Sequence, residues 1–218
     1  MIISRQRRYV FVHIPKTGGT AMALALEARA ARDDILIGDT PKALARRGRL
    51  GGLRVPGRLW KHSTLADIDG LLDADEMAAF LIFTLVRNPW DRMVSYYHWL
   101  RDQSFDHPAV PRAKSIDFSD FLNHPATQRS VEALPYSSYV SDPTGADRAG
   151  LYIRLQHLEA DMAPLSAHLG FAPALPFVNQ SARDRDWRPY YTDADAATVG
   201  RICAQDIAQF KYGFDPTP

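Results

Sequence analysis

Residues 13–20, with the sequence HIPKTGGT, combine a lysine, two glycines and two threonines near the start of the chain. Glycine lets a backbone approach an anion closely, and the N–H groups at the start of a helix attract negative charge. Lys16 adds a full positive charge, and the hydroxyl groups of Thr17 and Thr20 can donate hydrogen bonds. The sequence therefore predicts a loop that binds a phosphate-like anion.

The spacing of this loop differs from the G-x-x-x-x-G-K-[ST] pattern of common ATP-binding loops. Val10 stands where such a loop has its first glycine, and Pro15 directly precedes Lys16. The later apolar run FLIFTLV ends at Arg87, where an ATPase would place an acid for Mg²⁺. These departures favour an anion other than the tail of ATP. A nucleotide or small-molecule kinase with a P-loop remains an alternative.

Arg87 and Ser95 form a second candidate anion site. We predict that residues 87–102 form a helix with Asn88 as N-cap and Asp91 completing a capping-box-like pattern. Residues three, four and seven apart stack on one face of a helix, which aligns Asn88, Asp91 or Arg92, and Ser95. A guanidinium and a hydroxyl group at the end of a strand can bind a phosphate. Two anion sites indicate a nucleotide that is phosphorylated at both ends.

The elements around these residues alternate between strands and helices, which indicates an α/β fold. Strands are predicted at 8–14, 35–37, 80–86 and 150–156. Helices are predicted at 20–32, 71–80, 87–102, 117–124, 158–170 and 193–213, with Asp193 as a cap and Gly213 as a stop. Pro164 is expected to kink or divide its helix, and loops are expected at 104–116 and 172–191. We find no repeat or linker and predict a single domain over residues 1–218.

The segment 41–61 carries seven basic residues, four glycines and no acid. Its basic residues are Lys42, Arg46, Arg47, Arg49, Arg54, Arg58 and Lys61. We predict a mobile basic loop with two possible roles. It is either a solvated surface or the border of an acceptor cleft that attracts an anionic acceptor.

Composition excludes several classes of protein. The net charge of +1 gives no global field for nucleic acid, so we expect no nucleic-acid partner. Cys203 is the only cysteine, so no intrachain disulfide can form, and we place it in the core. The first residues lack the apolar region of a secretory signal, and no window approaches the roughly 18 apolar residues of a membrane span. We expect a cytoplasmic protein, with peripheral membrane contact left open.

Three stretches resemble the sulfotransferases, in particular the heparan-sulfate 2-O-sulfotransferases and their bacterial relatives. They are FVHIPKTGGT (11–20), FTLVRNPWDRMVSYYHW (83–99) and the C-terminal segment 175–214. The resemblance implies a P-loop-like three-layer sandwich, in which helices flank a central, mainly parallel sheet. It also implies 3′-phosphoadenosine-5′-phosphosulfate (PAPS) as sulfate donor and 3′,5′-ADP as product. No metal is required if the loop N–H groups and Lys16 stabilise the leaving phosphate.

The same resemblance assigns roles to individual residues. Cofactor binding falls to Pro15, Lys16, Thr17, Gly18, Gly19, Thr20, Arg87, Ser95 and Arg183. Lys16 also stabilises the leaving phosphate, and His62 in WKHSTLADI matches the position of a catalytic base. His13 is the second candidate for the base, and a purely structural role of His62 is the alternative.

The acceptor implied by the resemblance is a saccharide hydroxyl, on a lipid, a polysaccharide or an oligosaccharide. Four tryptophans could stack on sugar rings or belong to the core, namely Trp60, Trp90, Trp99 and Trp187. A non-catalytic protein that binds PAPS or glycan is a further alternative to the enzyme. The oligomeric state is not predicted.

Overall fold

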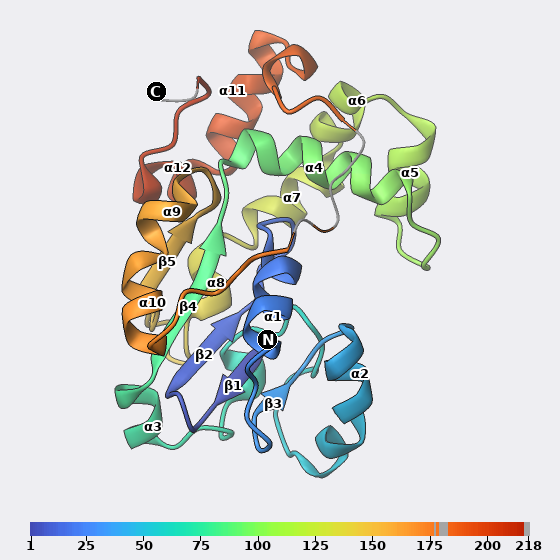
Figure 1. Cartoon of the computed structure of the whole chain (residues 1–218). Helices are drawn as coiled ribbons and strands as arrows, with labels where there is room; N and C mark the ends of the chain where they lie inside the picture. The colour runs from blue at the N-terminus through green and yellow to red at the C-terminus, as the bar shows by residue number, and fades with distance from the viewer. Residues whose placement is uncertain (177, 179–182, 216–218) are drawn as a thin grey trace. The chain divides into compact units, whose positions relative to one another are not determined.

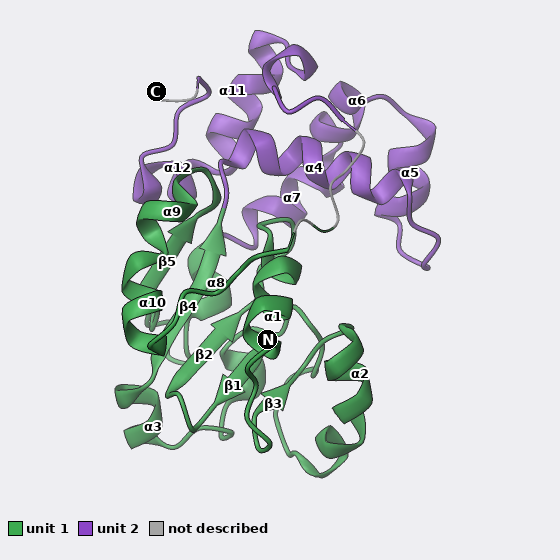
Figure 2. Cartoon of the chain, viewed as in Figure 1, with its two compact units in different colours: residues 1–86, 136–179 green, residues 87–135, 180–218 purple. Residues whose placement is uncertain are grey.

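The computed structural model describes residues 1–176, 178 and 183–215 (Figure 1). The chain forms two compact units (Figure 2). Unit 1 comprises residues 1–86 and 136–179, and unit 2 comprises residues 87–135 and 180–218. Each unit has a hydrophobic core of its own. The single domain expected from the sequence stays a prediction.

Unit 1 is built on a five-stranded sheet with the order β3-β1-β2-β4-β5. The strands are β1 (Ile2–Ser4), β2 (Tyr9–Val12), β3 (Ile35–Leu36), β4 (Leu81–Val86) and β5 (Leu151–Arg154). β2, β4 and β5 are parallel, whereas β1 is antiparallel to both of its neighbours. The four predicted strands are confirmed, and β1 is an addition that the sequence analysis missed.

The central strands are buried on both faces, as expected for a parallel sheet covered by helices. Phe11 and Phe83 pair in register and face the same core as Met22 of α1 (Gly19–Glu27) and Leu165 of α10 (Ala163–Leu169). The alternate side chains, such as Ile82, are also buried, and α8 (Tyr136–Val140) contacts β4. Helices therefore flank a mainly parallel sheet, which confirms the predicted α/β architecture.

The helices of unit 1 follow the prediction only in part. They are α1 (Gly19–Glu27), α2 (Pro41–Arg46), α3 (Ala74–Ala79), α8 (Tyr136–Val140), α9 (Leu158–Asp161) and α10 (Ala163–Leu169). Short 3₁₀ helices are η1 (Arg47–Gly52), η2 (Ala66–Ile68) and η3 (Leu155–His157). The predicted helix 158–170 is divided before Pro164, as expected, and ends at Gly170 with φ of 74°.

The prediction of a mobile basic loop at 41–61 is wrong, because α2 and η1 lie within it. Thr40 caps α2 by accepting from the backbone N–H of Ala43. Three of the cations donate to backbone carbonyls at and after the end of α1. Lys42 donates to the carbonyl of Glu27, Arg46 to that of Ala31, and Arg49 to that of Arg32. The last carbonyls of a helix lack partners within it, and Lys42 binds one of them, whereas the two arginines bind carbonyls of the loop that follows α1.

Unit 2 is helical. It contains α4 (Pro89–Arg101), α5 (Ala109–Ser115), α6 (Phe118–Asn123), α7 (Pro125–Glu132), η4 (Arg188–Tyr190), α11 (Asp193–Ile202) and α12 (Ala204–Phe210). Its core gathers Trp90, Tyr97, Phe121, Trp187 and Cys203, which confirms the buried cysteine.

Three boundaries in unit 2 correct the prediction. The expected loop 104–116 contains α5, whose Ala109, Val110 and Ala113 are buried. The terminal helix is broken at Cys203 and ends at Phe210, because Lys211 adopts a left-handed conformation before Gly213 is reached. Its N-cap is Thr192 rather than Asp193, in a capping box with Asp195. Within the described residues, no helix has the length and apolar character needed to cross a membrane.

Candidate active site

The loop between β2 and α1 has the backbone of an anion site. Lys16 (φ 68°) and Gly18 (φ 86°) both adopt left-handed conformations. For a residue other than glycine this conformation is uncommon, and it occurs often at ligand sites. The first turn of α1 has no acidic residue, and Gly18 provides no side-chain cap. The N–H groups at this helix end can therefore bind an anion.

His13 closes one side of the loop. A Cβ atom at Gly19 would lie 2.0 Å from Cδ2 of His13, so the imidazole packs directly on the glycine backbone. His13 is 6% exposed, and burial holds its pKa well below the ordinary value. The absence of a side chain at Gly19 thus brings a neutral histidine ring against the loop.

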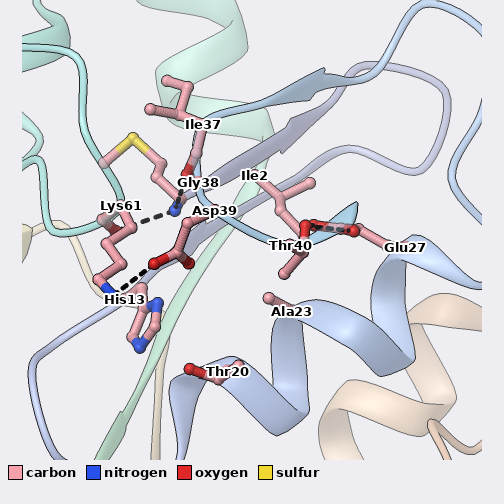
Figure 3. Close-up of a pocket in the computed structure, with 11 residues that line it drawn as sticks. Ile2, His13, Thr20, Ala23, Glu27, Ile37, Gly38, Asp39, Thr40 and Lys61 are labelled. Atoms are coloured by element: carbon pink, nitrogen blue, oxygen red, sulfur yellow. Dashed lines mark hydrogen bonds and ion pairs between the residues drawn. The ribbon is translucent and has the colours of Figure 1, made fainter. Parts of the chain in front are cut away.

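Thr17 differs from the expectation that its hydroxyl group serves the anion. The side chain is fully buried, and its hydroxyl donates to the carbonyl of Ile14 at 2.9 Å. Thr17 therefore closes the turn and has only its backbone N–H to offer. Thr20 is partly exposed and lines a small cavity (Figure 3).

His62 is held in one tautomer by a single contact. Its Nδ1 lies 2.7 Å from the backbone carbonyl oxygen of His13. A carbonyl only accepts, so Nδ1 carries the proton and Nε2 keeps a lone pair. Burial, opposed by this hydrogen bond, lowers the pKa of His62 to about 4. The imidazole is therefore neutral at neutral pH, as a general base must be.

Hydrogen bonds of Ser63 stabilise the turn that carries His62. Ser63 is fully buried, accepts from the backbone N–H of Trp60 at 2.9 Å, and donates to the carbonyl of Arg58 or Trp60 at 2.7 or 2.8 Å. The rings of Trp60 and His13 meet His62 edge-on, with centroids 5.0 and 4.6 Å away. The guanidinium of Arg58 lies over Trp60 at 5.1 Å. His62 thus stands between an exposed tryptophan and the ring that packs on the loop.

A cavity of about 10 Å³ lies beside His13. Figure 3 shows its lining residues, which include Thr20, Glu27, Asp39 and Lys61. Lys61 and Asp39 form an ion pair of 2.6 Å at its edge, and Thr40 donates to Glu27 at 2.7 Å. Burial raises the pKa of Glu27. The cavity has room for about one water molecule, so it is too small for a nucleotide or a sugar.

Unit 2 contains a compact ionic cluster at the start of α4. Arg87 donates to Asp91 through Nε at 2.7 Å and through Nη2 at 2.8 Å. Arg183 donates to the same carboxylate through Nη2. Ser95, one turn further along α4, is 4% exposed. The structure therefore brings Arg87 and Arg183, two of the three unit 2 residues that the sequence assigned to a phosphate, together around a carboxylate, and Ser95 lies on the same helix.

Asp91 departs from its predicted role as a capping residue. Its carboxylate binds two guanidinium groups, and the cap of α4 is the Asn88 side chain, which accepts from the N–H of Trp90 at 3.1 Å. The spacing of four residues between Arg87 and Asp91 was the signal available in the sequence. The role of Ser63 had no such signal.

The predicted site residues are distributed over both units. The loop Pro15–Thr20, His13 and His62 belong to unit 1, whereas Arg87, Ser95 and Arg183 belong to unit 2. Part of the C-terminal segment that carries the third resemblance, residues 177 and 179–182, lies outside the described residues. Within the described part of the chain, no group of three or more His, Cys, Asp or Glu side chains could hold a metal ion.

Comparison with known proteins identifies the family. The model of the sulfotransferase family matches residues 1–214. The chain belongs to the sulfotransferase family. Among solved structures, it is similar to mouse sulfotransferase SULT7A1 complexed with PAP, with a TM-score of 0.55 and 16% identity. The match covers 94% of this chain and 86% of the mouse chain, and confirms the P-loop-like fold. No curated protein matches the sequence.

Proposed function

We propose that this sulfotransferase moves a sulfuryl group from PAPS to a saccharide hydroxyl and releases 3′,5′-ADP. Family membership supports sulfuryl transfer, and the PAP complex of mouse SULT7A1 supports the nucleotide. The observation that carries the proposal is the state of His62. Its ring is neutral, Nδ1 is committed to the His13 carbonyl, and His13 packs on an anion-binding loop.

We assign the two anionic ends of the nucleotide to the two positively charged groups of residues. We assign the 5′-phosphosulfate to the loop 15–20, through the backbone N–H groups of residues 16–20 and the side chain of Lys16. These groups lie at the start of α1, whose first turn has no acidic residue. We assign the 3′-phosphate to Arg87, Arg183 and the hydroxyl group of Ser95. Guanidinium groups bind phosphate through two parallel hydrogen bonds, which supports this division.

Bound PAPS would supply the sulfuryl group, which passes to the acceptor oxygen as the bond from sulfur to the bridging phosphate oxygen breaks. Nε2 of His62 accepts the proton of the acceptor hydroxyl. Lys16 and the loop N–H groups stabilise the negative charge left on the phosphate. We propose that these groups suffice without a metal ion.

The acceptor assignment rests on the resemblance to saccharide sulfotransferases and on one tryptophan. Trp90 and Trp187 are 6% and 7% exposed and belong to the core of unit 2, whereas Trp60 is 40% exposed and contacts His62. A glycolipid would also present such a hydroxyl group. Cytoplasmic localisation and peripheral membrane contact stay predictions.

Calorimetric titration with 3′,5′-ADP, followed by transfer from radiolabelled PAPS to a saccharide panel in EDTA, tests the proposal. We expect nucleotide binding and sulfate transfer without metal. Lys16→Ala should lower turnover more than 3′,5′-ADP affinity, because the charge that Lys16 meets is largest in the transition state. Mg²⁺-dependent ATP hydrolysis without 3′,5′-ADP binding would overturn the proposal in favour of a kinase.

A further inference from the structure

The ionic cluster of unit 2 contains an unexpected negative charge. Arg87 and Arg183 are the cations assigned to a phosphate, yet both donate to the carboxylate of Asp91. The side chains are well covered, with exposures of 15% for Arg87, 10% for Asp91 and 6% for Arg183. Asp91 is therefore an integral member of this cluster.

The geometry distinguishes the two arginines. Arg87 presents the edge formed by Nε and Nη2 to both oxygens of Asp91, a fork that fixes the plane of its guanidinium. Arg183 donates through Nη2 to the carboxylate of Asp91. Its Nη1 donates to the backbone carbonyl of Asp184 at 3.0 Å. The carboxylate of Asp91 thereby contributes to holding both long side chains in place.

Two effects of Asp91 on a nearby phosphate oppose each other. Its negative charge repels the phosphate, but that repulsion is reduced because two guanidinium groups already neutralise it. Against this, a phosphate that binds to freely rotating arginines must first order two of the side chains that lose most rotamer freedom. With the carboxylate buried between its cations, we judge the ordering effect to be larger.

We propose that Asp91 is a positioning residue, which orients Arg87 and Arg183 for the 3′-phosphate of the nucleotide. This inference rests on the proposed function, since that phosphate belongs to PAPS and 3′,5′-ADP. Removing the negative charge of Asp91 should therefore weaken phosphate binding, although simple charge counting predicts that binding becomes tighter.

The test compares the affinities of 3′,5′-ADP and 5′-AMP, which lacks the 3′-phosphate, by calorimetry. For Asp91→Asn we expect 3′,5′-ADP to bind about tenfold more weakly, the factor that one charged hydrogen bond typically contributes. The affinity for 5′-AMP should stay unchanged. Asp91→Glu keeps the charge and should recover part of the loss, and it also serves where the Asn variant does not fold. Asp186→Asn removes an exposed carboxylate paired with Arg188 and is the matched control.

A second measurement separates positioning from general structural damage. In an Arg87→Ala, Arg183→Ala background, Asp91→Asn should have no further effect on 3′,5′-ADP affinity, because Asp91 acts through those side chains. Unchanged or tighter 3′,5′-ADP binding by Asp91→Asn overturns the inference, as does an equal loss for 5′-AMP. Equal binding of both nucleotides by the unmodified protein would instead refute the proposed 3′-phosphate site, and the inference with it.

Discussion

His62 gives a pH dependence that an ordinary histidine would not. Burial, its largest influence, lowers its pKa to about 4, so the base form is fully present well below pH 6.5. We expect kcat/KM to be flat between about pH 5 and 8, and to fall only as the pH approaches 4. Initial rates at low acceptor concentration measure this profile. An acid limb near pH 6.5, retained in His62→Ala, would show that another group is the base.

Trp60 offers the acceptor an apolar surface next to the base. We expect Trp60→Ala to raise the acceptor KM about tenfold, as truncation of a contact tryptophan commonly does, and Trp60→Phe to raise it less. The affinity for 3′,5′-ADP should not change. Leu44→Ala, which truncates another exposed apolar residue of unit 1, is the matched control. A Trp60→Ala variant with normal acceptor KM would place the acceptor elsewhere.

At the scale of residues, some contacts could be predicted from the residue type and its neighbours in the sequence, and others could not. The glycines of the loop were predictable, because their conformational freedom is local. The hydroxyl of Thr17 was not, because its carbonyl partner on Ile14 depends on how the turn closes. Asp91 was read as a cap from its distance to Asn88. Its partner Arg183 lies 92 residues away, and no local pattern reports such a contact.

At the scale of elements, three cations of the basic segment bind carbonyls at and after the end of α1, in addition to the two roles expected from the sequence, a solvated surface or the border of an acceptor cleft. Arg46 of α2 donates to the carbonyl of Ala31 at 2.7 Å in a partly buried hydrogen bond. Arg46→Ala should lower the free energy of unfolding by about 1 kcal/mol and leave acceptor KM unchanged. Arg47→Ala removes an exposed charge and should have no measurable effect on stability. Urea denaturation of both variants makes the comparison. A raised acceptor KM in Arg46→Ala would restore the electrostatic role.

Elements with strong local signals were predicted well, namely β2, β4 and α4. The two strands have runs of β-branched and apolar residues and are buried on both faces. The helix α4 has a clear N-cap and is buried along one face. α5 and α2 were missed because prolines, glycines and charges suggested loops, whereas tertiary contacts stabilise both helices. Ala109, Val110 and Ala113 of α5 are buried in the core of unit 2, and basic side chains of 41–61 satisfy carbonyls near the end of α1. Packing and long-range hydrogen bonds override local propensity in both cases.

At the scale of the whole molecule, acid should destabilise the fold through unit 1. His13 and His62 both have lowered pKa values, because burial disfavours their charged forms. The unfolded chain binds these protons near pH 6.5, whereas folded His62 does so only near pH 4. The stabilisation is complete above pH 6.5 and is lost as the pH falls through this window. For His62 alone, about 2 kcal/mol is lost between pH 7 and 5. The raised pKa of Glu27 acts in the opposite direction.

Denaturation at pH 7 and 5 tests both this dependence and the single-domain prediction. His62→Gln should show a smaller loss of stability at pH 5 than the unmodified chain, because one of the two buried histidines is gone. Trp90, Trp99 and Trp187 belong to unit 2, so tryptophan fluorescence reports mainly that unit, while circular dichroism reports both. If the chain unfolds as a single cooperative domain, the fluorescence and circular dichroism transitions shift together between pH 7 and 5, although both histidines lie in unit 1. Separate transitions, with only circular dichroism sensitive to acid, would show that the two units unfold independently.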